Sequence, residues 1–89
     1  MVYYSHAIIQ QIKGAVDKIA LKEIIDASLR DLQSKRGNTS SAKRSFILNM
    51  IMALKYLNAE GLPVKESENV NTAIGILEAA RRQEYENLF

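Results

Sequence analysis

Aliphatic and aromatic residues recur every three or four positions along four stretches of the chain. That spacing lines one face of an α-helix, so it predicts four amphipathic helices packed around a shared core. The alternation of apolar and polar residues that would indicate strands is scarce. The predicted core stripes are, in chain order, Tyr4, Ile8, Ile9, Ile12, Val16 and Ile19; Leu21, Ile24, Ile25, Ser28, Leu29 and Leu32; Phe46, Ile47, Met50, Ile51, Ala53, Leu54 and Leu57; and Val70, Ala73, Ile74, Leu77 and Ala80.

The first two stripes follow each other almost without a break. We predict a short turn near Asp17 to Ala20, which would separate two helices; one long, bent helix is the alternative. Gly14 lies inside the first stretch, where it disfavours a helix by up to about 1 kcal/mol relative to alanine.

The second helix has a clear predicted end. Lys35 and Arg36 fall in its last turn, where cations meet the negative end of the helix dipole, and Gly37 suits the left-handed closing position. Residues 38–41, "NTSS", then offer side chains that can cap the start of the next helix.

The third predicted helix runs from about Ser41 to Glu60 and is the most apolar element. Gly61 is its expected closing residue, Leu62 the expected contact back onto the helix, and Pro63 prevents its continuation. Because apolar residues surround so much of this helix, we expect it to be central and contacted from several sides.

Short connections between successive helices favour antiparallel neighbours. The expected fold is therefore all-α, an antiparallel up-down four-helix bundle, with residues 1–89 forming a single helical domain.

Composition places the chain among globular proteins, because 47% of its residues are hydrophobic and 25% are charged. It has no cysteine, so disulfides and thiolate metal sites are excluded. The first residues lack the pattern of a signal peptide, and the most apolar stretch, residues 46–57, is shorter than the ~20 residues that cross a bilayer. We expect a cytoplasmic location.

The chain lacks the residue patterns of an active site. His6 is its single histidine, no serine stands in a nucleophile elbow, and the glycines are too isolated to cradle a phosphate. The acid pairs Glu66/Glu68 and Glu84/Glu86 are two residues apart, which puts the members of each pair on different faces of a helix. We therefore expect no enzyme activity, metal, cofactor or small-molecule substrate.

Residues 35–44, "KRGNTSSAKR", carry four basic side chains and no acidic one. Lys35, Arg36, Lys43 and Arg44 could together contact phosphates of a nucleic acid. A solvated corner between two helices explains the same pattern, and the helix that follows is too apolar to read bases. We favour the corner.

Other side chains are candidates for protein contacts. Met52 and Tyr56 lie one turn apart, away from the predicted core face of the third helix. Leu88 and Phe89 near the end of the chain would either fold back onto the helices or meet a partner.

Taken together, residues 21–77 resemble the immunity proteins of pediocin-like (class IIa) bacteriocins. The resemblance is carried by "LKEIIDASLRDLQSK", a polar linker with serines, "FILNMIMALKYLNAEGLPV" and a further helix with spaced aliphatic residues. It consists of aliphatic spacing more than of fixed side chains.

The resemblance implies a small cytoplasmic four-helix bundle that protects a producer cell from its own peptide toxin. Such proteins recognise the mannose-phosphotransferase membrane permease with its bound bacteriocin, from the inner face of the membrane, and block the lethal pore. In that family the second half of the chain decides which toxin is resisted. Carried onto this sequence, the expected partner-binding residues are Lys55, Tyr56, Arg81, Arg82, Tyr85 and Phe89.

Two other functions remain open. One is a small DNA-associated or regulatory helical protein that uses the basic segment described above, and the other is an oligomerisation module.

Overall fold

The chain forms four helices: α1 (Val2–Lys13), α2 (Lys18–Arg36), α3 (Ser40–Glu60) and α4 (Val64–Glu86). The computed structural model describes the backbone of residues 2–36 and 40–86 and the side chains of residues 6–32 and 42–84. No strand occurs in these ranges. The radius of gyration is 12.7 Å, close to the ~12 Å expected of a compact domain of this length. The predicted all-α class is confirmed.

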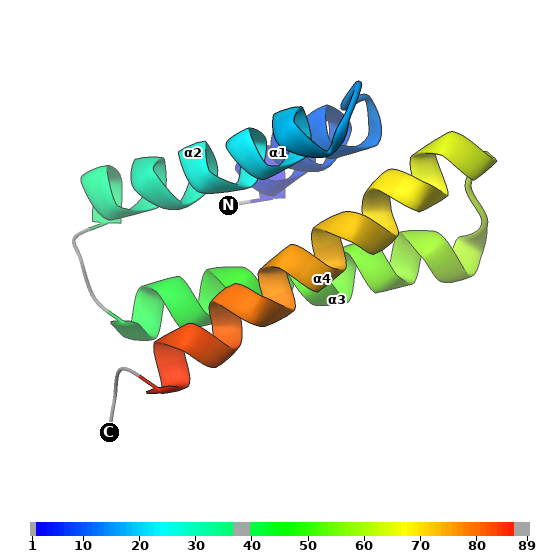
Figure 1. The fold of residues 1–89 in the computed structure, drawn as a ribbon. Coiled ribbons are helices and arrows are strands. Elements are labelled where there is room, and N and C mark those ends of the chain that lie inside the picture. Colours follow the sequence, from blue (N-terminus) through cyan, green and yellow to red (C-terminus); the bar gives the residue numbers. More distant parts are fainter. Residues whose placement is uncertain (1, 37–39, 87–89) are drawn as a thin grey trace.

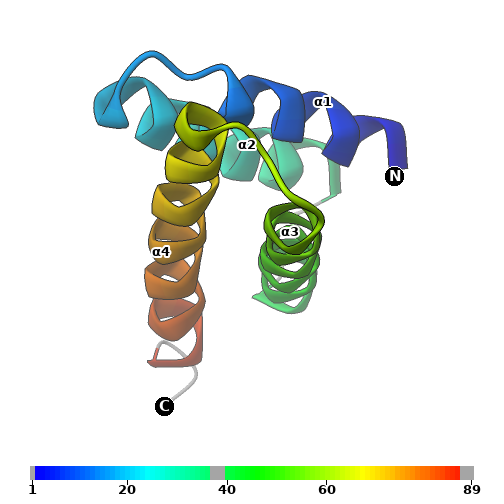
Figure 2. The same cartoon turned by 90° about the vertical axis from the view of Figure 1, so that its right-hand side faces the viewer.

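The helices form two layers, with α3 and α4 running in opposite directions in one layer and α1 and α2 lying across them (Figures 1 and 2). The contact between α3 and α4 is the most extensive, and α4 also packs on both α1 and α2. α3 packs on α4 and, less extensively, on α2. The expectation that the most apolar helix would be central is therefore wrong: α4 is central, and α3 lies at an edge.

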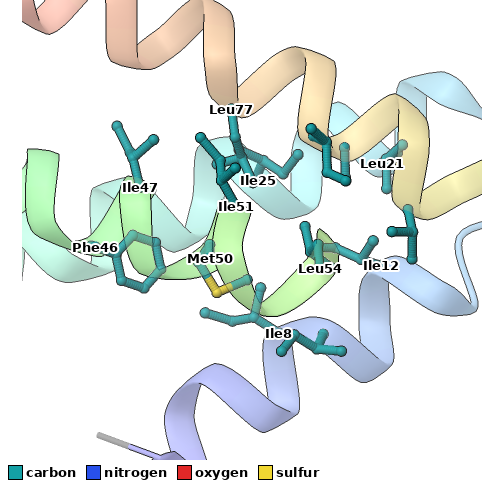
Figure 3. Packing of buried hydrophobic residues seen from close by; sticks show 14 of the residues in the cluster. Ile8, Ile12, Leu21, Ile25, Phe46, Ile47, Met50, Ile51, Leu54 and Leu77 are labelled. Carbon is teal, nitrogen blue, oxygen red and sulfur yellow. The ribbon is translucent and has the colours of Figure 1, made fainter. Parts of the chain in front are cut away.

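A single hydrophobic cluster contains residues from all four helices (Figure 3). Ile8 of α1 lies beside Met50 of α3, and Ile12 lies beside Leu54. Leu21 of α2 and Leu77 of α4 belong to the same cluster. The buried members are Ile8, Ile9, Ile12, Ala15, Leu21, Ile25, Leu32, Phe46, Ile47, Met50, Ile51, Leu54, Val70, Ala73, Ile74 and Leu77. The predicted stripes of the second, third and fourth helices are thus confirmed at most positions.

Two separate helices precede residue 37, as predicted, but the turn between them lies earlier than expected. α1 ends at Lys13 and α2 begins at Lys18, so the turn covers residues 14–17. The carboxylate of Asp17 accepts a hydrogen bond from the backbone N–H of Ala20 at 2.8 Å, which caps the start of α2. Asp17, which was predicted to lie in the turn, therefore sets the residue at which α2 begins.

The early turn overturns two predicted core positions. Val16 and Ile19 are 79% and 77% exposed. Their assignment assumed that the helical phase of α1 continues, whereas the turn breaks that phase and buries Ala15 instead. Tyr4 is outside the described side chains.

The turn between α3 and α4 follows the prediction. Gly61 has φ 104° and donates its N–H to the carbonyl oxygens of Leu57 and Asn58, closing α3. Leu62 packs against the core. The predicted closing role of Gly37 lies outside the described residues.

Candidate protein-binding surface

The outward face of α3 carries large apolar side chains that the core does not use. Leu48, Met52 and Tyr56 are 38%, 60% and 57% exposed. They are spaced four residues apart, so they lie in one line along the helix. Two residues before Met52, Met50 is buried at 2% exposure. α3 is therefore apolar on two opposite faces, and the protein covers only one of them.

Charged groups beside this line are compensated within the chain. Nζ of Lys55 lies 3.5 Å from Oε2 of Glu78, which joins α3 to α4 at the surface. The hydrogen bond to the carboxylate of Glu60, with a smaller contribution from desolvation, raises the pKa of Tyr56 above its ordinary value of 10.0. The phenol is therefore neutral and polarised toward Glu60 at physiological pH.

A shallow groove runs along the other side of Tyr56, between α1 and α3. It exists because the backbones of α1 and α3 approach each other closely at few positions, although side chains of both helices meet in the core. Its volume is about 280 Å³. The residues that line it are His6, Ile9, Gln10, Lys13, Ala53, Tyr56 and Leu57. Most of its lining is apolar, as in many protein-binding grooves.

The predicted partner-binding residues lie on two neighbouring helices. Lys55 and Tyr56 are exposed on α3, and Arg82 is exposed on α4. Arg82 follows Glu78 by one helical turn, which places it on the same side of α4 as the Lys55 contact. Arg81 is half-buried, with its Nε atom buried.

Tyr85 and Phe89 were also predicted to bind the partner. The side chain of Tyr85 and all of Phe89 lie outside the described part of the chain, as does Leu88. The described candidates therefore centre on the exposed side of the α3 and α4 pair.

The structure describes two of the four basic side chains of residues 35–44, Lys43 and Arg44, and neither is fully exposed. Lys43 is an ion-pair partner of Glu84 on α4, with 3.2 Å between Nζ and Oε2, and the two side chains are only 23% and 11% exposed. Nη1 of Arg44 is also buried. The side chains of Lys35 and Arg36 are outside the described set. Lys43, at least, has its charge compensated by a carboxylate and stabilises the helix pair.

Sequence reasoning missed Leu48 as an exposed residue. The sequence signal was present, because Leu48 precedes Met52 by the same four residues that separate Met52 from Tyr56. It was obscured because neighbouring positions are also apolar, so the pattern does not say which face is covered. The groove needs the relative placement of α1 and α3, for which the sequence gives no signal.

Within the described side chains, no three histidine or acidic residues lie together in a way that could hold a metal ion. None of the four helices, over its described residues, is both long and apolar enough to cross a membrane. What the arrangement offers chemically is a line of apolar contacts, a shallow groove and neighbouring charged side chains. These are the features of a protein-binding surface.

No family model, curated protein or solved structure matches this chain. Its function must therefore be argued from its own residues.

Proposed function

We propose that this protein is a bacteriocin immunity protein of the pediocin-like class. It acts by binding, without catalysis, in the cytoplasm at the inner face of the membrane. Its partner is a permease of the mannose phosphotransferase type that has engaged the toxin. We also propose that the four helices form an antiparallel up-down bundle.

One observation carries this proposal: the outward face of α3 is apolar although no other helix covers it. Exposed Met52 and Tyr56 supply adaptable and aromatic contact area, and such residues are enriched in protein interfaces. Because Leu48, Met52 and Tyr56 lie in one line, they form a continuous apolar surface on which a partner can pack.

Electrostatics on the neighbouring side of the helix pair supports the same surface. Lys55 and Arg82 are exposed there, and Glu78 lies within ion-pair distance of Lys55. Among the described side chains, Arg82 has no carboxylate in ion-pair contact as Lys55 has Glu78, which suits Arg82 to a partner's acidic group. Charges at the edge of an apolar patch select the partner and its orientation more than they add affinity.

The test is a protection assay in a bacterial strain that is sensitive to pediocin-like peptides. Expression of the protein should raise the concentration of at least one such peptide needed to stop growth. The double variant Lys55→Ala and Arg82→Ala should lose most of this protection while its helix content and thermal unfolding stay unchanged.

The matched control is Lys65→Ala, which removes another exposed cation, from the first turn of α4. Its protection should equal that of the unchanged protein. Absence of protection against every pediocin-like peptide tried would contradict the proposed function.

The nucleic-acid alternative is the second candidate, and the placement of Lys43 counts against it. A lysine already paired with Glu84 releases little free energy on binding a phosphate. A mobility shift that weakens with salt and disappears when Lys35, Arg36, Lys43 and Arg44 are replaced would instead favour it.

A further inference from the structure

We propose that the outward face of α3 pairs with the same face of a second copy of this chain. The two α3 helices run antiparallel, and the two-fold axis passes beside Met52. The residues involved form what we name the symmetric stripe: Ser45, Leu48, Met52, Tyr56 and Ala59.

The order of side-chain sizes along the symmetric stripe is the first argument. Leu48 and Tyr56 lie four residues before and after Met52, and Ser45 and Ala59 lie seven before and after it. In an antiparallel two-fold pair centred on Met52, a residue before the centre faces the residue equally far after it on the other copy. Large side chains then meet large ones, and the small end residues allow the helices to approach closely.

The stripe is accessible in the fold. α3 lies at the edge of the molecule, and two of its sides face away from the other three helices when it is viewed along its axis (Figure 2). Leu48, Met52 and Tyr56 are all exposed. From residue 45 to residue 59 the stripe is about 21 Å long, so it spans four turns of a facing helix.

Charge distinguishes a second copy from a foreign partner. Self-pairing brings identical charges toward each other, so a self-pairing face must carry little uncompensated charge. The cation nearest Met52, Lys55, has its carboxylate partner Glu78 on the same chain. The symmetric stripe itself contains no charged residue, and the carboxylate of Glu60 lies beyond its end, eight residues from the central Met52.

The interface is small. A stripe about 21 Å long on a helix about 10 Å wide covers less than the ~800 Å² per partner of a standard stable interface. Self-association is therefore expected to be weak, with dimers forming only at high protein concentration.

The absence of cysteine from the sequence allows a direct test of which faces meet. Helix axes about 8–10 Å apart leave roughly 3–5 Å between facing Cα atoms, which overlaps the ~4.4–6.8 Å range of a disulfide. Met52→Cys should therefore form a disulfide dimer under mild oxidation. The control is Val64→Cys, at an exposed apolar residue outside the stripe, and it should react at least about tenfold more slowly.

A mixture of Leu48→Cys and Tyr56→Cys tests the antiparallel direction. Intact mass measurement separates the mixed dimer from the two like dimers, and the mixed dimer should exceed its statistical share. Excess of the like dimers would overturn the antiparallel arrangement.

Sedimentation of the unmodified protein over a range of concentrations completes the test. Its average mass should rise with concentration, and Met52→Glu should abolish the rise while Val64→Glu does not. A constant monomer mass together with equal oxidation rates for Met52→Cys and Val64→Cys overturns the proposal and leaves the stripe to a different protein. The protection assay tests a separate contact. Self-association is expected to be weak, so the stripe of a monomer stays free for the receptor, and the variants Lys55→Ala and Arg82→Ala lie outside the symmetric stripe.

Discussion

Removal of the Asn69 side chain should destabilise the fold. It is buried on α4 at 6% exposure. Its Nδ2 atom donates hydrogen bonds to the carbonyl oxygens of Lys13 and Ala15, both at 3.0 Å. These carbonyls belong to the last residue of α1 and the turn after it, so Asn69 closes the end of α1 from a helix more than 50 residues away in sequence.

The cost of Asn69→Ala can be estimated from these two bonds. Each contributes about 1 kcal/mol net, and a carbonyl left dry adds up to about 1 kcal/mol more. The contact with Ala15 is buried and the one with Lys13 is only partly buried, so one dry carbonyl is expected. The predicted loss is about 2–3 kcal/mol in the free energy of unfolding, or roughly 10–20 °C in Tm for a domain of this size.

Urea and thermal unfolding followed by circular dichroism provide the assay, and Asn71→Ala provides the matched control. Asn71 is exposed on the same helix, and its Oδ1 accepts one exposed hydrogen bond from Asn58. Its substitution should cost about 0.5 kcal/mol or less.

A second variant separates lost hydrogen bonds from lost volume. Asn69→Asp keeps the size of the side chain but turns a carboxylate oxygen toward two carbonyl oxygens, so it should be at least as destabilising as Asn69→Ala. Equal costs for Asn69→Ala and Asn71→Ala, or an Asn69→Asp variant as stable as the unchanged protein, would refute the reasoning.

Three further predictions concern glycines, an ion pair and a phenol. Gly61→Ala should lower the free energy of unfolding by about 1 kcal/mol, because φ is 104° at this position. Gly75→Ala should raise it by up to about 1 kcal/mol, because a Cβ meets open space in the exposed middle of α4. Urea unfolding of both variants checks that the two changes have opposite signs. Glu84→Gln should cost about 1–3 kcal/mol in the same assay, because it leaves a lysine ammonium partly buried without its carboxylate. The tyrosinate absorbance of Tyr56, isolated by difference with Tyr56→Phe, should titrate above pH 10.0, and Glu60→Ala should lower that pKa because the acceptor is lost.

Helical periodicity was sufficient to predict the four helices and most of the buried positions. Ile12, Leu54 and Leu77 were assigned to the core from spacing alone, and all are at most 1% exposed. The close of α3 at Gly61 was also predictable, because glycine followed by proline within two residues is a local signal. Local signals of this kind need no knowledge of the other helices.

Predictions that depended on long-range packing were less successful. Val16 and Ile19 were assigned to the core because their spacing continues that of α1, yet the chain turns after Lys13. One contact that holds this turn, from Asn69, comes from a distant helix. Gly14 and Asp17, which caps α2, are local signals of a break. An asparagine in a helical pattern, however, gives no signal of which backbone it will meet, so the contact from Asn69 could not be predicted.

The features of the candidate surface were also predicted only in part. Exposure of Met52 and Tyr56 was predicted from their place off the core stripe, and both are more than half exposed. The burial of Lys43 beside Glu84 was not predicted, because 41 residues separate the two and basic residues near a helix start usually face solvent. The basic segment looked like a continuous patch only while its contacts with α4 were unknown.

The two methionines of α3 show why folding and recognition can be separated on one helix. Met50 and Met52 are two residues apart, about 200° around the axis, and they are 2% and 60% exposed. Truncating Met50 removes core packing, whereas truncating Met52 removes apolar surface that the monomer leaves in water. An exposed apolar line contributes little to the stability of the isolated chain and increases its tendency to associate. Binding, to a toxin-engaged receptor or to a second copy, is the property that this line of side chains can serve.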